Sequence, residues 1–208
     1  MIERLFQDPM YFVVTVVAIV IAISVHEFAH AAMAYYLGDS TAKNEGRLTL
    51  NPLSHLDLWG TILLLVAGFG WGKPVPFNPY NLKNQRWGPA LVSLAGPASN
   101  LVMAIVFMIF LRFGYPLLGL AAGNALFDFL YYLIVINVIL MAFNLLPVPP
   151  LDGSKLLFAV LPSSMDSVKE FLQRYGMFIL IGLVFFGGVF LSLVYGTLIS
   201  GVNWFLGL

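Results

Sequence analysis

Long apolar stretches, separated by short polar ones, dominate the sequence. Those long enough to cross about 30 Å of hydrocarbon as helices lie at about 10–37, 88–112, 121–146 and 175–207. A polar stretch at 38–57 follows the first of them, and the helix-breaking sequence PVPPLDGS follows the third. The pattern predicts an all-α polytopic membrane protein of about four transmembrane helices, in a single domain covering 1–208.

A further apolar stretch, at 58–69, has only about twelve residues, which is too short for a comfortable crossing. The sequence GFGWGKPVPFNPYN follows it, and the residue before each proline is disfavoured in the helical region. We therefore expect a re-entrant or extended segment at about 57–80.

The first apolar stretch has one competing interpretation, a cleaved signal peptide, because Ala-His-Ala at 29–31 resembles a cleavage site. Signal peptides begin with a positively charged region. Here Glu3 and Asp8 outweigh Arg4, and the rest of the chain is also apolar. We interpret the stretch as a retained transmembrane helix.

The composition narrows the class of protein. Hydrophobic residues make up 60% of the chain and charged residues 10%, whereas a soluble domain has about 25% charged residues. Disorder would need low hydrophobicity and a high net charge. Ten Lys+Arg balance ten Asp+Glu, so no basic excess is present to bind nucleic acid. The absence of cysteine excludes disulfides, thiolate metal sites and a cysteine nucleophile.

The first predicted span contains the sequence HEFAH, from His26 through Glu27 to His30. Histidines at i and i+4 share a helix face, so both imidazoles can bind one Zn²⁺ while the glutamate acts on the metal-bound water. Ionisable groups are costly inside a bilayer, which favours a functional role for the cluster. The alternative is a pair of hydrogen-bonded structural histidines with a snorkelling glutamate.

A catalytic zinc site usually has three protein ligands and one open position. The metzincin extension of the motif would need glycine and histidine where this chain has Met33 and Tyr36, so that pattern fails. By residue type, the remaining candidates for the third ligand are Glu45, His55, Asp57 and Asp152.

Two motifs together resemble the site-2 protease family of intramembrane zinc metalloproteases: HEFAH at 26–30 and NLLPVPPLDG at 144–153. The stretches that are similar to short bacterial and archaeal members are NPLSH at 51–55, GWGKPVPFNP at 70–79 and AGPASN at 95–100. The resemblance covers residues from about 15 to 160. Larger relatives carry an extra span before the HExxH helix, and many carry a regulatory domain. We expect neither in this chain.

The resemblance implies that His26, His30 and Asp152 bind one Zn²⁺ per chain. It also implies that Glu27 is the general base, and that Asn144 contacts substrate or steadies the transition state. The implied reaction is hydrolysis of peptide bonds in or near transmembrane segments of membrane proteins. These substrates and the lipid bilayer would be the partners.

Topology provides a separate check. Asp152 and the two histidines can meet only if 58–69 is re-entrant, because a full crossing puts them on opposite sides. The re-entrant arrangement leaves only Arg4 and Arg112 on the far side. It gathers the other basic residues on one side: Lys43, Arg47, Lys73, Lys83, Arg86, Lys155, Lys169 and Arg174. By the positive-inside rule, we expect an integral protein of a prokaryotic cell membrane with its active site toward the cytoplasm.

In the implied reaction, zinc lowers the pKa of its bound water toward about 7. Glu27 takes the water proton and passes it to the leaving amine. Substrates must be unwound, and KPVPFN at 73–78 could pair with them as an extended edge. An ordinary interfacial loop is an equal alternative, because alternate prolines remove backbone donors.

Other polar positions lead to weaker expectations. His55 could orient a loop, contact substrate or gate zinc, or be a plain interfacial histidine. We expect Gly96, Pro97 and Asn100 to serve close helix packing, and Asn137 to hydrogen-bond between helices. Two other functions stay open: a metal transporter or sensor that uses the same ligands, and a non-catalytic relative that binds membrane proteins.

Overall fold

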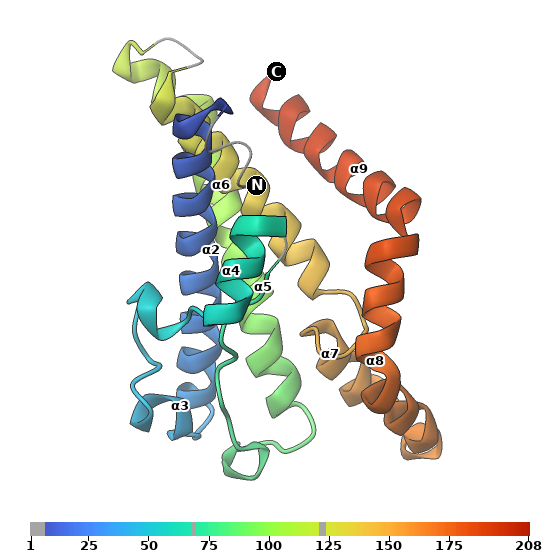
Figure 1. The fold of residues 1–208 in the computed structure, drawn as a ribbon. Helices are drawn as coiled ribbons and strands as arrows, with labels where there is room; N and C mark the ends of the chain where they lie inside the picture. The colour runs from blue at the N-terminus through green and yellow to red at the C-terminus, as the bar shows by residue number, and fades with distance from the viewer. Residues whose placement is uncertain (1–6, 68–69, 121–123) are drawn as a thin grey trace.

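The computed structural model describes residues 7–67, 70–120 and 124–208, and the helices dominate it (Figure 1). Arg4 and the expected beginning of the third span at 121–123 lie outside the described residues. The helices long and apolar enough to cross a membrane are α2 (Pro9–Tyr36), α5 with its continuation (Gly88–Leu118), α6 (Ala125–Asn144) and α9 (Gly188–Leu206). The described residues form no β-strand. The predicted class, an all-α protein with four potential spans, is confirmed.

The other helices lie between the potential spans. They are α3 (Thr41–Asn44), α4 (Leu58–Ala67), α7 (Gly153–Val160) and α8 (Asp166–Phe186). The regular part of α5 ends at Ile109 and continues through a π turn and a 3₁₀ turn to Leu118.

The helices α2, α5 and α6 pack against one another and form the centre of the molecule. Small side chains line these contacts: Ala18, Ala22 and Ala104 are fully buried. Small residues let helix backbones approach closely, which supplies much of the packing between helices in a membrane. Around them lies an apolar core that contains Leu111, Leu130, Ile134, Val138, Val202 and Leu206.

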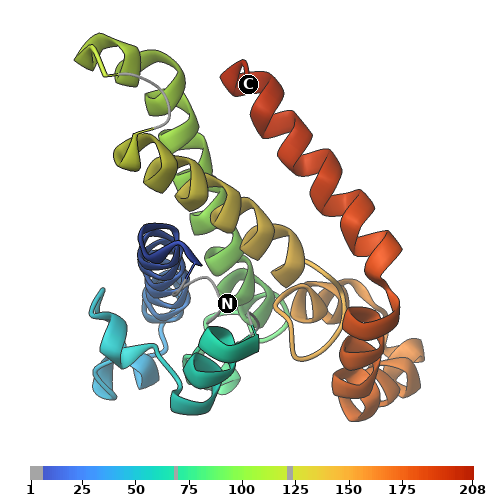
Figure 2. The same cartoon turned by 45° about the horizontal axis from the view of Figure 1, so that its top comes forward.

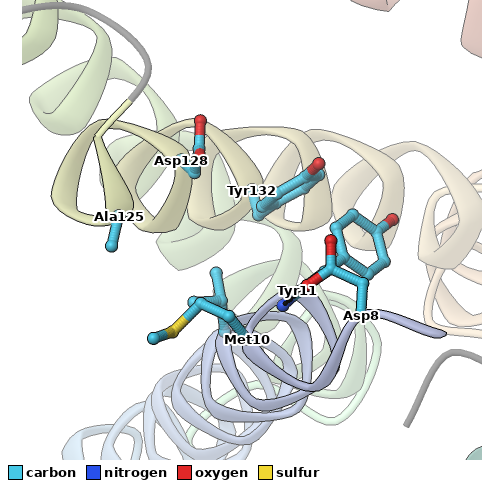
Figure 3. A pocket seen from close by; sticks show the side chains of 7 residues that line it. Asp8, Met10, Tyr11, Ala125, Asp128 and Tyr132 are labelled. Carbon is cyan, nitrogen blue, oxygen red and sulfur yellow. Dashed lines mark hydrogen bonds between the residues drawn. The ribbon is translucent and has the colours of Figure 1, made fainter. Parts of the chain in front are cut away.

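The N-terminal ends of α2 and α6 meet around a small cavity of about 180 Å³ (Figure 3). The Asp8 carboxylate accepts the backbone N–H of Tyr11 and so caps α2. The rings of Tyr11 and Tyr132 pack edge to face with their centroids 4.8 Å apart. His26 lies more than four turns further along the same helix, so this cavity is separate from the histidine cluster.

The backbone before α4 and the backbone after it lie next to each other. Leu56 and Gly72 form an antiparallel bridge, and the backbone N–H of Lys73 donates to the His55 carbonyl at 2.7 Å. The ten residues of α4 span about 15 Å, half of the hydrocarbon thickness. The two ends of this segment are therefore adjacent, as a re-entrant segment requires, whereas a full crossing would place them a bilayer apart.

The range 175–207, expected to hold one span, is divided between two helices. Helix α8 already begins at Asp166 and ends at Phe186, and α9 starts at Gly188 in a different direction (Figure 2). The glycine pair at 187–188 has no side chains to pack along a continuous helix, and glycine is a poor helix former.

Near its C-terminal end, α9 is joined to the bundle by two hydrogen bonds. Arg112 Nη1 donates to the Leu206 carbonyl at 2.7 Å, and the Tyr131 hydroxyl donates to Asn203 Oδ1 at 2.8 Å. The cation at the end of α9 also offsets the partial negative charge of the helix C-terminus.

Candidate metal centre

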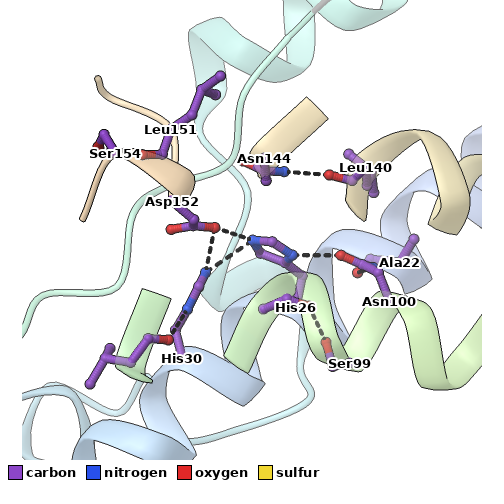
Figure 4. Close-up of polar contacts among 12 residues, drawn as sticks. Ala22, His26, His30, Ser99, Asn100, Leu140, Asn144, Leu151, Asp152 and Ser154 are labelled. Atoms are coloured by element: carbon purple, nitrogen blue, oxygen red, sulfur yellow. Dashed lines mark hydrogen bonds and ion pairs between the residues drawn. The ribbon is translucent and has the colours of Figure 1, made fainter. Parts of the chain in front are cut away.

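Three side-chain atoms from two distant segments converge beside α5 (Figure 4). His26 Nε2 and His30 Nε2, one turn apart on α2, lie 3.0 Å from each other. Each also lies 3.2 Å from Asp152 Oδ2, which enters from the residue just before α7. His26 is 6% exposed and His30 is 8% exposed. The three atoms form a nearly equilateral triangle inside the protein.

The hydrogen bonds of the other ring nitrogens show which atoms carry protons. His30 Nδ1 lies 2.7 Å from the Val92 carbonyl, which can only accept, so this nitrogen donates. His26 Nδ1 lies 2.6 Å from Asn100 Oδ1 and donates in the same way. Both imidazoles therefore direct an Nε2 lone pair at the carboxylate of Asp152.

Three lone-pair donors at one point repel each other unless a cation lies between them. Two neutral imidazoles and one carboxylate are a ligand set found at catalytic zinc sites. Zinc–ligand bonds of about 2.0–2.2 Å place the atoms of a tetrahedral site about 3.3–3.6 Å apart. The distances of 3.0–3.2 Å are slightly shorter and fit such an ion.

A tight turn after α6 brings Asp152 to the histidines. The backbone N–H of Val148 donates to the Leu146 carbonyl, and that of Leu151 donates to the Val148 carbonyl, at 2.8 and 2.9 Å. Leu151 is buried, and the Ser154 hydroxyl donates to its carbonyl at 2.6 Å. The turn thus fixes the backbone on both sides of the carboxylate.

Glu27 lies between the two histidines on α2, in an outer position. Its carboxylate and the two imidazoles each place one ligand atom within 4.8 Å of the others, whereas Asp152 approaches both histidines to 3.2 Å. The Glu27 carboxylate therefore lies close to the two histidines, and Asp152 makes the shorter contacts with them.

The backbone that follows α4 passes next to this glutamate. A Cβ atom on Gly72 would lie 3.7 Å from Glu27 Oε1 and 3.2 Å from the His55 carbonyl oxygen. From 73 to 78 the chain has no regular secondary structure. The KPVPFN segment therefore begins next to Glu27.

The structure separates the four candidates for a third ligand. Only Asp152 meets the histidines. Asp57 accepts the backbone N–H of Gly60 at 2.8 Å at the start of α4, and Glu45 is exposed after α3. His55 is fully buried and its Nε2 donates to the Thr49 carbonyl at 2.7 Å. His55 therefore holds the loop at 49–55 in place.

Asn144 lies on the last turn of α6, near the Asp152 side of the centre (Figure 4). Its Nδ2 donates to the Leu140 carbonyl at 3.0 Å, which fixes the amide and turns its oxygen away from that carbonyl. The side chain is partly buried.

Sequence reasoning assigned Gly96 and Asn100 to helix packing, but both contact the histidines. A Cβ atom on Gly96 would lie 2.4 Å from His30 Nε2 and 2.6 Å from His26 Cε1, so only glycine leaves room for the two rings. Asn100, four residues on, holds His26 Nδ1. The i, i+4 spacing of a glycine and an asparagine inside a span is the signal that could have indicated a shared face.

A buried carboxylate just beyond α2 anchors the extended segment. Asp39 is fully buried and accepts the Thr41 hydroxyl at 2.6 Å, the Asn78 backbone N–H at 2.7 Å and Asn81 Nδ2 at 2.9 Å. Burial alone would raise the pKa of Asp39, but these hydrogen bonds outweigh it and hold the pKa below its usual value. The anchor joins the end of α2 to 78–81.

Comparisons with known proteins show the family of this chain. The family model described as peptidase family M50 matches residues 115–184. YwhC of Bacillus subtilis is 44% identical over 167 residues, which cover 79% of this chain and 76% of YwhC. The chain belongs to peptidase family M50. This is the site-2 protease family that the two sequence motifs resemble.

Two further relatives of this M50 peptidase have lower sequence identity. Rip2 of Mycobacterium tuberculosis strain H37Rv is 34% identical over 156 residues, covering 68% of this chain and 55% of Rip2. MJ0611 of Methanocaldococcus jannaschii is 30% identical over 146 residues, covering 70% of each chain. The chain thus spans about half the length of Rip2. YwhC, Rip2 and MJ0611 all carry the provisional name of zinc metalloprotease. No solved structure matches the chain.

Proposed function

We propose that this M50 peptidase is an intramembrane zinc metalloprotease that cleaves peptide bonds in or near transmembrane segments of membrane proteins. The observation that carries the proposal is the triangle of His26 Nε2, His30 Nε2 and Asp152 Oδ2. It lies in a protein whose described residues include four helices long and apolar enough to span a bilayer. Ionisable groups at such a depth are costly and mark functional sites.

We assign the metal ligands to His26, His30 and Asp152. When bound, Zn²⁺ polarises the scissile carbonyl and makes a water molecule more acidic. Two neutral imidazoles and one carboxylate offset only one of its two positive charges, so the centre remains able to attract a hydroxide and a carbonyl oxygen. The hydrogen bonds at both Nδ1 atoms keep the two Nε2 atoms aimed at one point.

Glu27 is the general base and then the general acid. It takes a proton from the attacking water, whose oxygen bonds to the carbonyl carbon. The same proton then passes to the amine nitrogen as the C–N bond breaks. Proximity supports this role, since the carboxylate and the ligand nitrogens lie within 4.8 Å of one another. The half-buried position of Glu27 leaves the carboxylate reachable from the Gly72 side.

Substrate would enter as extended chain along 72–78, beside Glu27. Pro74 and Pro76 have no N–H to offer, so pairing relies on carbonyl groups and on the N–H groups of Val75 and Phe77. The Asn144 side chain accepts a hydrogen bond from the peptide on the other side of the centre. Asp39 supports this arrangement because it holds Asn78, at the end of the segment, against α2.

The metal centre would face the cytoplasm. The C-terminal end of α2, the N-terminal end of α5 and the N-terminal end of α8 point toward one end of the molecule (Figure 1). The helices and connections between the potential spans α2 and α5, and between α6 and α9, carry Lys43, Arg47, Lys73, Lys83, Arg86, Lys155, Lys169 and Arg174. Arg112 follows α5 at the opposite end. The positive-inside rule assigns the basic end to the cytoplasm.

Purified full-length protein in detergent, with a model transmembrane substrate, tests the proposal. Glu27→Gln should retain about one zinc per chain and lose cleavage, because only the proton carrier is removed. Cleavage by this variant at the wild-type rate would contradict the mechanism. A metal transporter would need further sites along a path, but the described residues contain one cluster of this type. Zinc flux into liposomes that survives Glu27→Gln would favour transport.

A further inference from the structure

A buried hydrogen-bond chain connects His26 to the backbone of α6. His26 Nδ1 lies 2.6 Å from Asn100 Oδ1 on α5, and Asn100 Nδ2 lies 2.7 Å from Asn137 Oδ1 on α6. Asn137 Nδ2 lies 2.7 Å from the Leu133 carbonyl oxygen. Both asparagines are fully buried. This chain of hydrogen bonds therefore links α2, α5 and α6, and its two asparagine side chains are shielded from bulk water.

The backbone carbonyl groups that take part fix which end of each asparagine amide donates and which accepts. The Leu133 carbonyl can only accept, so the Asn137 amide must present its NH₂ group there and its oxygen to Asn100. Asn100 then donates its NH₂ group to Asn137, and it also donates to the Ala22 carbonyl at 3.3 Å. Its oxygen is left facing His26. Reversal would leave the Leu133 and Ala22 carbonyls without these donors.

The direction of the chain decides the tautomer of His26. Because Asn100 presents an acceptor, the ring must carry its hydrogen on Nδ1, and the Nε2 lone pair is then free to bind a metal ion. His30 obtains the same result from the Val92 backbone. His26 is thus the histidine whose tautomer depends on a side chain that can be replaced.

We propose that Asn100 is a positioning residue of the metal centre and that Asn137 holds it in the required orientation. The pair selects the metal-binding tautomer of His26 before an ion arrives. This inference rests on the proposed ligand role of His26. It goes beyond helix packing, because a packing role requires only that the two amides bond each other.

The test measures zinc affinity and metal-free stability separately. Full-length protein in detergent is stripped of metal and titrated with zinc against a competing chelator. Its Tm is recorded with and without zinc, and Co²⁺ loading gives a visible spectrum of the ligand field. The variants are Asn100→Ala, Asn100→Asp and Asn137→Ala. Ser99→Ala is the matched control, because that hydroxyl donates only to the Gly96 carbonyl of its own helix.

Loss of a histidine's hydrogen-bond partner typically lowers metal affinity about 10–100-fold, and we expect this range for Asn100→Ala. Asn137→Ala should lose less than about tenfold, since Ala22 still orients Asn100. Asn100→Asp should bind zinc nearly as wild type, because a carboxylate also accepts from His26 Nδ1. Its metal-free Tm should nevertheless fall as in Asn100→Ala, because both variants lose the NH₂ donor. Ser99→Ala should match wild type throughout.

Unchanged zinc affinity in Asn100→Ala would overturn the inference. So would equal losses of affinity in Asn100→Ala and Asn100→Asp, which would indicate a packing role. If Asn100→Ala does not fold, the zinc affinities of Asn100→Asp and Asn137→Ala still decide the question. A packing role predicts that Asn100→Asp loses more zinc affinity than Asn137→Ala. Wild-type protein that binds no zinc would instead contradict the proposed function itself, so the two failures are distinguishable.

Discussion

Asp152 Oδ2 lies 3.2 Å from His26 Nε2, although the two residues belong to α2 and to the turn after α6. The metal centre is therefore complete only when the turn has folded back against α2. A metal ion that binds both segments should stabilise the folded protein, because the unfolded chain does not hold the ligands together.

Removal of this carboxylate should abolish tight zinc binding. Asp152→Ala leaves two imidazoles, and we expect zinc content after dialysis to fall well below one ion per chain. The stabilisation by zinc should fall with it, from about 4 kcal/mol at a zinc concentration 1,000 times the Kd. Metal analysis and Tm measurements with and without zinc check this. Asp166→Ala, which removes an exposed carboxylate paired with Lys169, is the control. Full zinc content in Asp152→Ala would exclude Asp152 as a ligand.

The space at Gly96 should be as important as the ligands themselves. In Gly96→Ala the new methyl group would overlap the His30 ring, at 2.4 Å from Nε2, so the two imidazoles must turn away or α5 must shift. We expect zinc content and cleavage both to be lost. Gly196→Ala is a matched control, because a Cβ there meets nothing within 4 Å. Normal zinc binding by Gly96→Ala would show that the rings need no such gap.

A larger side chain at position 72 should separate substrate access from metal binding. Gly72→Leu places its side chain beside Glu27 Oε1, where we expect the peptide to lie, and leaves the three ligands in place. Cleavage of a transmembrane substrate should fall at least about tenfold while zinc content stays near one per chain. Steady-state kinetics and metal analysis on the same sample test this. Unimpaired cleavage would mean that substrate approaches from another side.

Asp39 should contribute a pH-dependent part of the stability. Asp39→Asn places an NH₂ group among several donors, and a buried unsatisfied group costs about 1–3 kcal/mol in the free energy of unfolding. Because folding lowers the pKa of Asp39, its contribution is full above the unfolded pKa of about 3.9 and is lost as pH falls through the folded value.

The difference in Tm between wild type and Asp39→Asn should therefore be largest near neutral pH and should narrow below about pH 4. Thermal unfolding in detergent across this range measures it. A difference that stays constant with pH would show that the charge of Asp39 does not carry the effect.

The local features of the site could be predicted from the sequence because they depend on short-range periodicity. A helix repeats every 3.6 residues, so His26 and His30 had to share a face wherever that helix packs. The lengths of the apolar stretches likewise indicated the potential spans, since the hydrocarbon thickness sets how many residues a crossing needs. The glycine pair at 187–188, which divides α8 from α9, is visible in the sequence, but its effect on direction depends on packing.

Beyond the ligand set that the family resemblance implied, the tertiary structure decided which groups meet. Residue type left Glu45, His55, Asp57 and Asp152 equal as partners of the two histidines, and the turn after α6 brings only Asp152 to them. Likewise, Gly96 and Asn100 touch the imidazoles only because α5 packs along α2 in one register. Side-chain contacts between helices depend on the rotation and depth of each helix, and no local pattern determines these. The sequence by itself thus determined the helices and the chemistry they carry, and helix packing decided the partners of each residue.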